Sequence, residues 1–294
     1  MCSKVKSEEI AEIVTKNKEE YPVRKMCKTL GISKSRYYEL LEKRPGKRKL
    51  EDEKLKGKIK KIWEESKKRY RSPKIRAILI KKGYKVGLPR IQKLMREEGV
   101  KSIVVKKYKL QSRKKEEEKQ EYENKLEQNF EAQKPNEKWV TDITYIWTKK
   151  DGWCYLASVM DIYNNEKKGW TFDKSMTVEL IKKALENAVK RANKPRGTIV
   201  HSDRGSQYTS SEYRRMLKKY GMVESYNKKG CPYDNACIES FHASIKKELI
   251  YVEEYETYED ALKSIFEYIE SFYNRKRIQE KLGYKSPTEF GAAA

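Results

Sequence analysis

The sequence predicts a mixed α/β domain in its second half, preceded by small all-α units. Between residues 136 and 226, short runs rich in β-branched and aromatic residues alternate with amphipathic helical patterns. Before residue 100, apolar residues recur every three to four positions and glycines end the predicted helices. The formal net charge is +24, from 68 Lys and Arg against 44 Asp and Glu. An excess of this size indicates a polyanionic partner such as nucleic acid.

The positive charge has two simpler causes that stay open. Lysine also keeps proteins soluble, and abundant Lys and Glu also occur in thermophilic proteins. The five Cys stand singly, and with His201 and His242 as the two histidines the sequence supports no zinc ribbon, redox pair or His-His-Cys-Cys module. No apolar run reaches the length of a bilayer span and no secretory signal opens the chain. We therefore expect no membrane partner and a reducing cytoplasm.

Residues 1–46 have the pattern of three short helices. Ser7 and Ser33 are predicted N-caps, and Pro22 begins the middle helix. The last two helices resemble a helix-turn-helix, whose second helix enters the major groove of DNA. Lys34 and Arg36, at the start of that helix, are the predicted DNA contacts. An ordinary three-helix unit with a basic surface is the alternative.

Residues 47–105 are predicted to form a second helical DNA-binding unit. Leu55, Ile59 and Ile62 form one apolar face, Ser72-Pro73 gives a cap with proline at the first helical position, and Pro89 begins another helix. Basic side chains remain for phosphates. The predicted contacts among them are Arg71, Lys74 and Arg90. A solvated basic face again is the alternative.

Residues 106–135 are predicted to be a charged linker. The first ten residues are basic and the next three are acidic, with few apolar anchors, so we expect an extended or partly helical connector. Lys106 and Lys107 are predicted to lie along a DNA backbone.

Residues 136–250 are predicted to form the α/β domain. Strands are expected at 139–147, 153–160, 168–172, 198–201 and 222–225, and Asp151-Gly152 is a strong hairpin signal. Amphipathic helices are expected at 177–192 and 211–220, and a loop rich in Gly, Pro and Asn leads to a further helix. Three antiparallel strands followed by two strands joined through helices is the ribonuclease H-like arrangement. The fold prediction is thus a ribonuclease H-like, mixed five-stranded sheet with flanking helices.

Three acids occupy distinctive places in this pattern. Asp142 lies midway along the first, central strand, Asp203 ends the neighbouring fourth strand, and Glu239 lies on the last helix. Each acid alone is also compatible with an ordinary bulge, turn or solvated helix position, and Asp161 at the end of the second strand is expected to have only a turn role. Together the three predict a site for Mg²⁺, which prefers carboxylate oxygens. Two such ions roughly 3.5–4 Å apart serve phosphoryl transfer.

The flanks of these acids resemble the integrase core of bacterial insertion-sequence transposases. They are WVTDITY at 139–145, HSDRGSQY at 201–208 and YDNA followed by ESF at 233–241. Sixty residues separate the first two acids and thirty-five the last two. The resemblance is to the second-frame product of the IS3 family, a relative of retroviral integrases, and it covers nearly the whole chain from about residue 21. Residues 273–275 and 282–287 resemble that family's C-terminal signature.

This resemblance implies a DDE transposase that cleaves and joins double-stranded DNA at the ends of its own element. Asp142, Asp203 and Glu239 would hold Mg²⁺ or Mn²⁺, two ions per site. Lys246, seven residues after Glu239 and two helical turns on, would contact DNA near the site; an ordinary surface lysine is the alternative. The family further implies a homo-oligomer on DNA, an upstream-frame helix-turn-helix protein or fusion as partner, and a place in the bacterial nucleoid. His242 is expected to be packed or solvent-facing rather than a metal ligand.

Residues 251–294 are predicted to add a long helix capped by Thr257 and a basic end, 275–277, that touches DNA. Two alternative functions stay open: a catalytically silent, transposase-derived repressor, and a ribonuclease H-like nuclease without strand transfer. The intact acids favour the transposase over the repressor. A nuclease without strand transfer explains the two N-terminal DNA-binding units less well than a transposase does.

Overall fold

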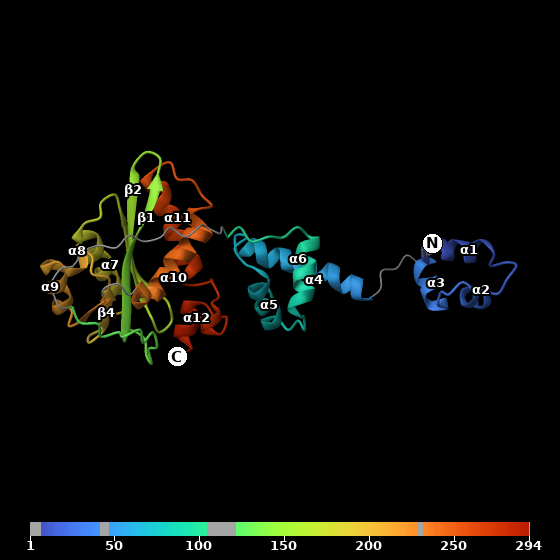
Figure 1. Ribbon diagram of the computed structural model, residues 1–294, viewed down its shortest axis with the longest axis horizontal. Helices are drawn as coiled ribbons and strands as arrows, with labels where there is room; N and C mark the ends of the chain where they lie inside the picture. Colours follow the sequence, from blue (N-terminus) through green and yellow to red (C-terminus); the bar gives the residue numbers. More distant parts are fainter. Residues whose placement is uncertain (1–6, 42–46, 105–121, 229–231, 294) are drawn as a thin grey trace. The chain divides into compact units, whose positions relative to one another are not determined.

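The computed structural model describes residues 7–41, 47–104, 122–228 and 232–293, and the chain divides into two compact units, Met1–Lys101 and Ser102–Ala294 (Figure 1). Within the described residues, no helix combines the length and the apolar character that crossing a bilayer requires.

The first three helices of the first unit share a small core. They are α1 (Ser7–Lys16), α2 (Val23–Thr29) and α3 (Lys34–Leu41). Their buried side chains are Ala11, Val14, Cys27, Ile32 and Tyr37. The predicted cap of α3 is confirmed, because Ser33 Oγ accepts the N–H of Arg36 at 3.1 Å. Gly31 has φ +72°, a conformation that glycine adopts without strain and that ends α2.

The next three helices are α4 (Lys47–Glu65), α5 (Ser72–Lys81) and α6 (Leu88–Glu97). The predicted apolar face of α4 is buried at Leu55, Ile59 and Ile62. The core is completed by Ile75, Leu79, Ile91, Leu94 and Met95. The predicted cap of α5 is off by one residue. Helix α5 already begins at Ser72, and its N-cap Arg71 makes no side-chain cap bond.

The second unit is built on a five-stranded sheet, which confirms the predicted fold. Its strands are β1 (Lys138–Thr148), β2 (Gly152–Asp161), β3 (Lys167–Asp173), β4 (Ile199–Ser202) and β5 (Val223–Tyr226), in the order β3-β2-β1-β4-β5. The first three are antiparallel, and β4 and β5 run parallel to β1. Strand β4 pairs with β1 only along Lys138–Val140, so this edge of β1 lacks a β4 partner further along.

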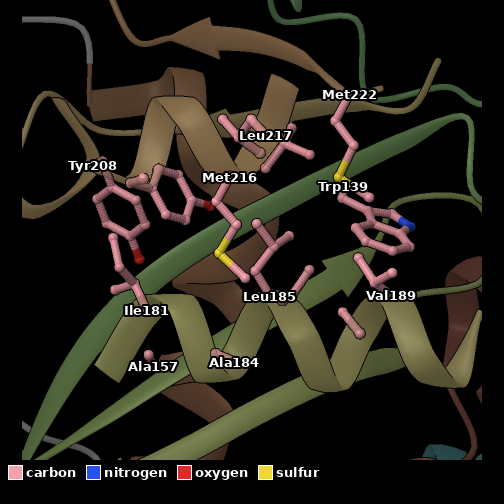
Figure 2. Close-up of a cluster of buried hydrophobic side chains, with 14 of the residues drawn as sticks. Trp139, Ala157, Ile181, Ala184, Leu185, Val189, Tyr208, Met216, Leu217 and Met222 are labelled. Carbon is pink, nitrogen blue, oxygen red and sulfur yellow. The ribbon is translucent and has the colours of Figure 1, made fainter. Parts of the chain in front are cut away.

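One face of the sheet is covered by α7 (Val178–Arg191), α8 (Ser206–Thr209) and α9 (Ser211–Lys219) (Figure 1). Figure 2 shows Leu185 of α7 and Met216 of α9 meeting near Trp139 of β1 in a buried core. Helix α7 packs so closely on β3 that a Cβ at Gly169 would lie 2.2 Å from the Ala184 carbonyl oxygen. The short α8 was not predicted from the sequence.

The other face carries α10 (Ala236–Ile245), α11 (Tyr258–Phe266) and α12 (Pro287–Ala292) (Figure 1). A turn of 3-10 helix, Pro232–Asn235, precedes α10, and another spans Glu280–Leu282. Helix α10 continues as a π-helical turn, Lys246–Ile250, and α11 as Glu267–Tyr273. Thr257 caps α11 with a full capping box, as predicted.

One residue of the basic end at 275–277 is turned inward. The guanidinium of Arg277 is buried, with Nη2 2.8 Å from Glu248 Oε1, and it also donates to Ser244. The ion pair with Glu248 partly neutralises the charge of Arg277, whereas Arg275 and Lys276 are exposed, so the DNA contact of 275–277 stays a prediction.

The predicted linker also differs where it is described. Residues 105–121 lie outside the described residues, but 122–135 pack on the sheet edge. The N–H of Tyr226 donates to the Glu123 carbonyl at 2.9 Å, the rings of Tyr122 and Tyr226 pack with centroids 4.8 Å apart, and Leu126 is buried. These anchors extend the second unit backwards from residue 136.

Candidate active site

Asp142 lies at the centre of the predicted acidic site. Its carboxylate is partly exposed on β1, and Oδ1 accepts the N–H of Ile143 at 2.8 Å. Its other oxygen, Oδ2, lies 3.2 Å from Nδ1 of His242 on α10. The side chain is thus held on two sides before any ligand arrives.

His242 is buried between the helix and the sheet. Its Nε2 lies 2.9 Å from Oγ of Ser158, which is fully buried on β2 and faces Asp142 in the β1–β2 register. The imidazole therefore links the two residues of one cross-strand pair. The sequence correctly predicts a packed histidine but misses this contact; the three-residue spacing from Glu239 was its only signal.

Asp203 directly follows β4 and closes a tight turn. Its Oδ1 accepts the N–H of Gly205 at 2.9 Å, and a Cβ at position 205 would lie 3.0 Å from the same oxygen. Burial raises the pKa of the Asp203 carboxyl, the Gly205 bond opposes that shift, and the negative charge of Asp142 adds to it. The acid thus combines the turn role with an electrostatic interaction across two strands.

Glu239 lies on the first turn of α10 with an exposed side chain. Partial burial raises its pKa, and the charge of Asp142 raises it further. The charge of Asp142 thus adds to the effect of burial on the pKa of both Asp203 and Glu239.

Hard oxygen donors that repel one another fit a divalent cation in chemical type. Across the described ranges, however, no three His, Cys, Asp or Glu side chains come close enough to hold one ion together. The donor set fits such an ion, and the present conformation leaves the carboxylates apart.

The predicted DNA-contact residues fall into four groups. Lys246 is half-buried, with Nζ 4.5 Å from the centre of the Tyr145 ring. Four exposed or half-exposed residues lie on α3 or at the start of α5: Lys34, Arg36, Arg71 and Lys74. Arg90 instead donates to Asp52 at 2.7 Å and joins α6 to α4. Lys106 and Lys107 lie outside the described residues.

Two more polar residues, Asp161 and His201, form hydrogen bonds that hold neighbouring segments of the fold. Asp161 is buried and accepts the N–H groups of Asn136 and Tyr163, as its predicted turn role requires. His201 bonds to Ser225 and Asn227 between β4 and β5, and burial lowers its pKa.

The sequence also missed Asp234, just before α10. Its carboxylate accepts bonds from Asn124, Gln128 and the N–H of Lys228, so it fixes the approach to the helix that carries Glu239.

Comparisons with known proteins match this arrangement. Models of an integrase core domain match residues 132–232 and 239–293, and a model of an HTH-like domain matches residues 49–108. The transposase InsF of insertion sequence IS3A from Escherichia coli (strain K12) is 35% identical over 287 residues, covering 94% of this chain and 96% of the relative.

The transposase of insertion sequence element IS904 from Lactococcus lactis is 39% identical over 251 residues, covering 85% of this chain and 98% of the relative. The integrase catalytic core domain of HTLV-2, solved with magnesium, aligns with 17% identity and a TM-score of 0.42 over 55% of this chain and 99% of that one.

Proposed function

The chain belongs to the DDE-type transposases of IS3-like insertion sequences, and we propose that Asp142, Asp203 and Glu239 form its catalytic site for cutting and joining DNA. The observation that carries this assignment is the placement of the acids: Asp142 lies on β1, and Asp203 directly follows β4, its parallel neighbour. Glu239 lies on α10, the helix whose His242 is 3.2 Å from Asp142. The matches to integrase cores and transposases give no support to the repressor alternative.

The same three carboxylates are the proposed ligands of Mg²⁺ or Mn²⁺, with two ions per site. When bound, such ions neutralise phosphate charge and activate the attacking oxygen. Contacts within the protein orient two of the three donors: His242 and the Ile143 N–H orient Asp142, and the Gly205 N–H orients Asp203. Asp142 lies on a rigid strand and Asp203 directly after one, which limits their movement.

The remaining parts receive proposed roles in binding DNA. Residues 1–46 and 47–105 would bind the element ends. The predicted linker, 106–135, would connect them to the core at 136–250, and its described part, 122–135, already packs on that core. Residues 251–294 would support the core. Transposition joins two ends, so a homo-oligomer on double-stranded DNA is the proposed active unit. An upstream-frame helix-turn-helix protein or fusion is the proposed partner, and the bacterial nucleoid the proposed place of action.

A strand-transfer assay tests the function. The full chain is mixed with a labelled duplex that carries the terminal repeat flanking its gene, with target plasmid, and with Mg²⁺, Mn²⁺ or EDTA. Joined product with either metal and none with EDTA is expected. Binding without any cutting would instead identify a repressor, and cutting without joining would identify a nuclease.

Thermal unfolding gives a second readout of the metal. Because the ionised acids repel one another, a cation that binds them should stabilise the folded protein. Mg²⁺ should raise the melting temperature of the wild type but not that of Asp142→Asn. Equal shifts in both proteins would place the ion elsewhere.

A further inference from the structure

Three large aromatic side chains lie exposed together on the β1–β2 hairpin. Tyr145, Trp147 and Trp153 are 57%, 52% and 51% exposed. The Trp153 ring makes edge-on contacts with both of the others, each with centroids 5.2 Å apart. Aromatic rings contribute most when they are covered, so a contiguous exposed group marks a surface that binds something.

These rings lie on the opposite face of β1 from the Asp142 side chain. Residues 142 and 145 are separated by an odd number of positions, and side chains alternate between the faces of a strand. Trp147 pairs with Trp153 across the hairpin, so these two residues lie on one face with Tyr145. The edge of β1 between Asp142 and Tyr145 lies beyond the segment that β4 pairs with.

Lys246 lies beside the aromatic rings. It begins the π-helical turn that continues α10, the helix of Glu239 and His242, and its ammonium lies 4.5 Å from the centre of the Tyr145 ring. A positive charge therefore lies against the aromatic rings, on the continuation of the helix that carries Glu239. A phosphate drawn to Lys246 would lie beside this aromatic surface.

Tyr145 lies three residues along β1 from Asp142, which is about 10 Å at roughly 3.3 Å per residue. A duplex DNA strand covers that length in about three nucleotides at about 3.4 Å each.

We propose that Tyr145, Trp147 and Trp153 form a stacking platform for unpaired bases of the strand whose phosphate lies at the acids, with Lys246 neutralising an adjacent phosphate. The proposal rests on the proposed function, because the acids define where that phosphate lies. Only unpaired or terminal bases present a free π-face, so the platform would select single-stranded DNA near the cut. A second copy of the chain is the less suitable occupant, because it brings another formal charge of +24.

The platform can be tested by comparing two DNA probes of equal length. The full chain is titrated into a fluorescein-labelled 20-nucleotide oligothymidine and into a labelled 20-base-pair duplex. The variants are Trp147→Ala with Trp153→Ala, the same pair changed to Phe, and Val252→Ala as a control at another exposed apolar position of the same unit.

The alanine pair should weaken single-strand binding by about fivefold or more for each base that loses its stacking partner. Duplex binding, which depends on phosphates, should change by less than about twofold. The Phe pair should retain most of the single-strand affinity, and Val252→Ala all of it. Oligothymidine should also quench the tryptophan fluorescence of the wild type more than that of the alanine pair.

Several results would overturn the platform. Unchanged single-strand affinity in the alanine pair would do so, as would equal losses for both probes. If light scattering showed that the alanine pair only reduces self-association, the rings would be a protein interface instead. Strand transfer by the wild type is measured separately. If the wild type is active and the alanine pair binds single strands as tightly as the wild type does, only the platform is rejected. If the wild type is inactive, the proposed function is rejected.

Discussion

The two units of the chain carry very different charge densities. Residues 1–101 contain 32 Lys and Arg against 14 Asp and Glu, a formal charge of +18, whereas residues 102–294 contain 36 against 30, a charge of +6. A third of the chain thus holds three quarters of the net charge. The first unit is suited to binding phosphates at many points. In the second unit, which contains Asp142, Asp203 and Glu239, positive and negative charges are nearly equal in number.

The units also differ in what they bury. Among its described residues, the first unit buries apolar cores and one charged side chain, Arg69. The second unit buries several charged groups as well: Asp161, Lys167, Asp234 and the Glu248–Arg277 pair. Buried charges fix geometry only where they are paired, and they destabilise where they are not. Mutations in the first unit should therefore affect mainly DNA binding, and mutations in the second unit mainly the chemical reaction.

The acids should give the largest separation. Asp142→Asn, Asp203→Asn and Glu239→Gln keep the shape of each side chain but remove the charge that holds metal. Each should lower strand transfer by at least the order of 10²- to 10³-fold that follows the loss of one electrostatic stabiliser. Duplex binding, measured by anisotropy, should stay within about twofold because the first unit is unchanged. Normal Mg²⁺-dependent turnover by any one variant would remove that acid from the site.

His242 should show a smaller effect within the same unit. His242→Ala removes the group that lies 3.2 Å from Asp142 and bonds Ser158, so the carboxylate loses its orientation. Residues that orient metal ligands typically contribute about 10- to 100-fold to metal affinity or activity. We expect a loss of that size with a higher half-saturating Mg²⁺ concentration, and partial recovery in His242→Asn, whose amide can still donate. Equal Mg²⁺ requirements in all three proteins would make His242 a packing residue only.

Lys167 tests the stability of the second unit by itself. Its Nζ has no hydrogen-bond partner among the described residues, and lies 3.8 Å from the centre of the Phe241 ring and 4.7 Å from that of Tyr273. Burial lowers the pKa of this ammonium group well below its usual value. Lys167→Met should therefore stabilise the unit by about 1–3 kcal/mol, the usual cost of an unpaired buried polar group. Melting of the first unit should not change.

The pKa of Lys167 predicts how the free energy of unfolding changes with pH. The lowered folded-state pKa means that, between that pKa and the ordinary value of 10.5, the unfolded chain binds a proton that the folded chain lacks. Wild-type stability attributable to Lys167 should then rise with pH in that window, and the advantage of Lys167→Met should shrink towards pH 10.5. A stability difference that stayed constant from pH 7 to pH 10 would show that Lys167 does not titrate on unfolding.

Much of the sheet and the positions of the acids follow from local patterns in the sequence. Strand β1 and helix α7 have strong periodicity and clear ends, and both occur where predicted. The contact between His242 and Asp142 joins residues one hundred positions apart, and no local pattern reports it. The inward turn of Arg277 depends on Glu248, which faces it only after α10 and α11 have packed. Residues 122–135 belong to the predicted linker because they lack a periodic pattern. The contacts of Tyr122 and Glu123 with Tyr226 of β5 join residues about one hundred positions apart, which local periodicity does not report.

The smallest predicted effect concerns salt, and it tests the charge difference between the units directly. Lys34→Gln with Arg71→Gln removes two exposed charges from the first unit, and Lys183→Gln with Lys190→Gln removes two exposed charges from α7 in the second. Both pairs lower the formal charge equally, so any difference between them reports position rather than total charge. Each phosphate contact contributes about −0.9 to the slope of log K against log salt for duplex DNA. The first pair should make the slope shallower by about one to two, measured by anisotropy between low and moderate salt, and the second should leave it unchanged. Equal changes in both pairs would mean that DNA senses the charge of the whole chain, and the first unit would lose its separate role in binding.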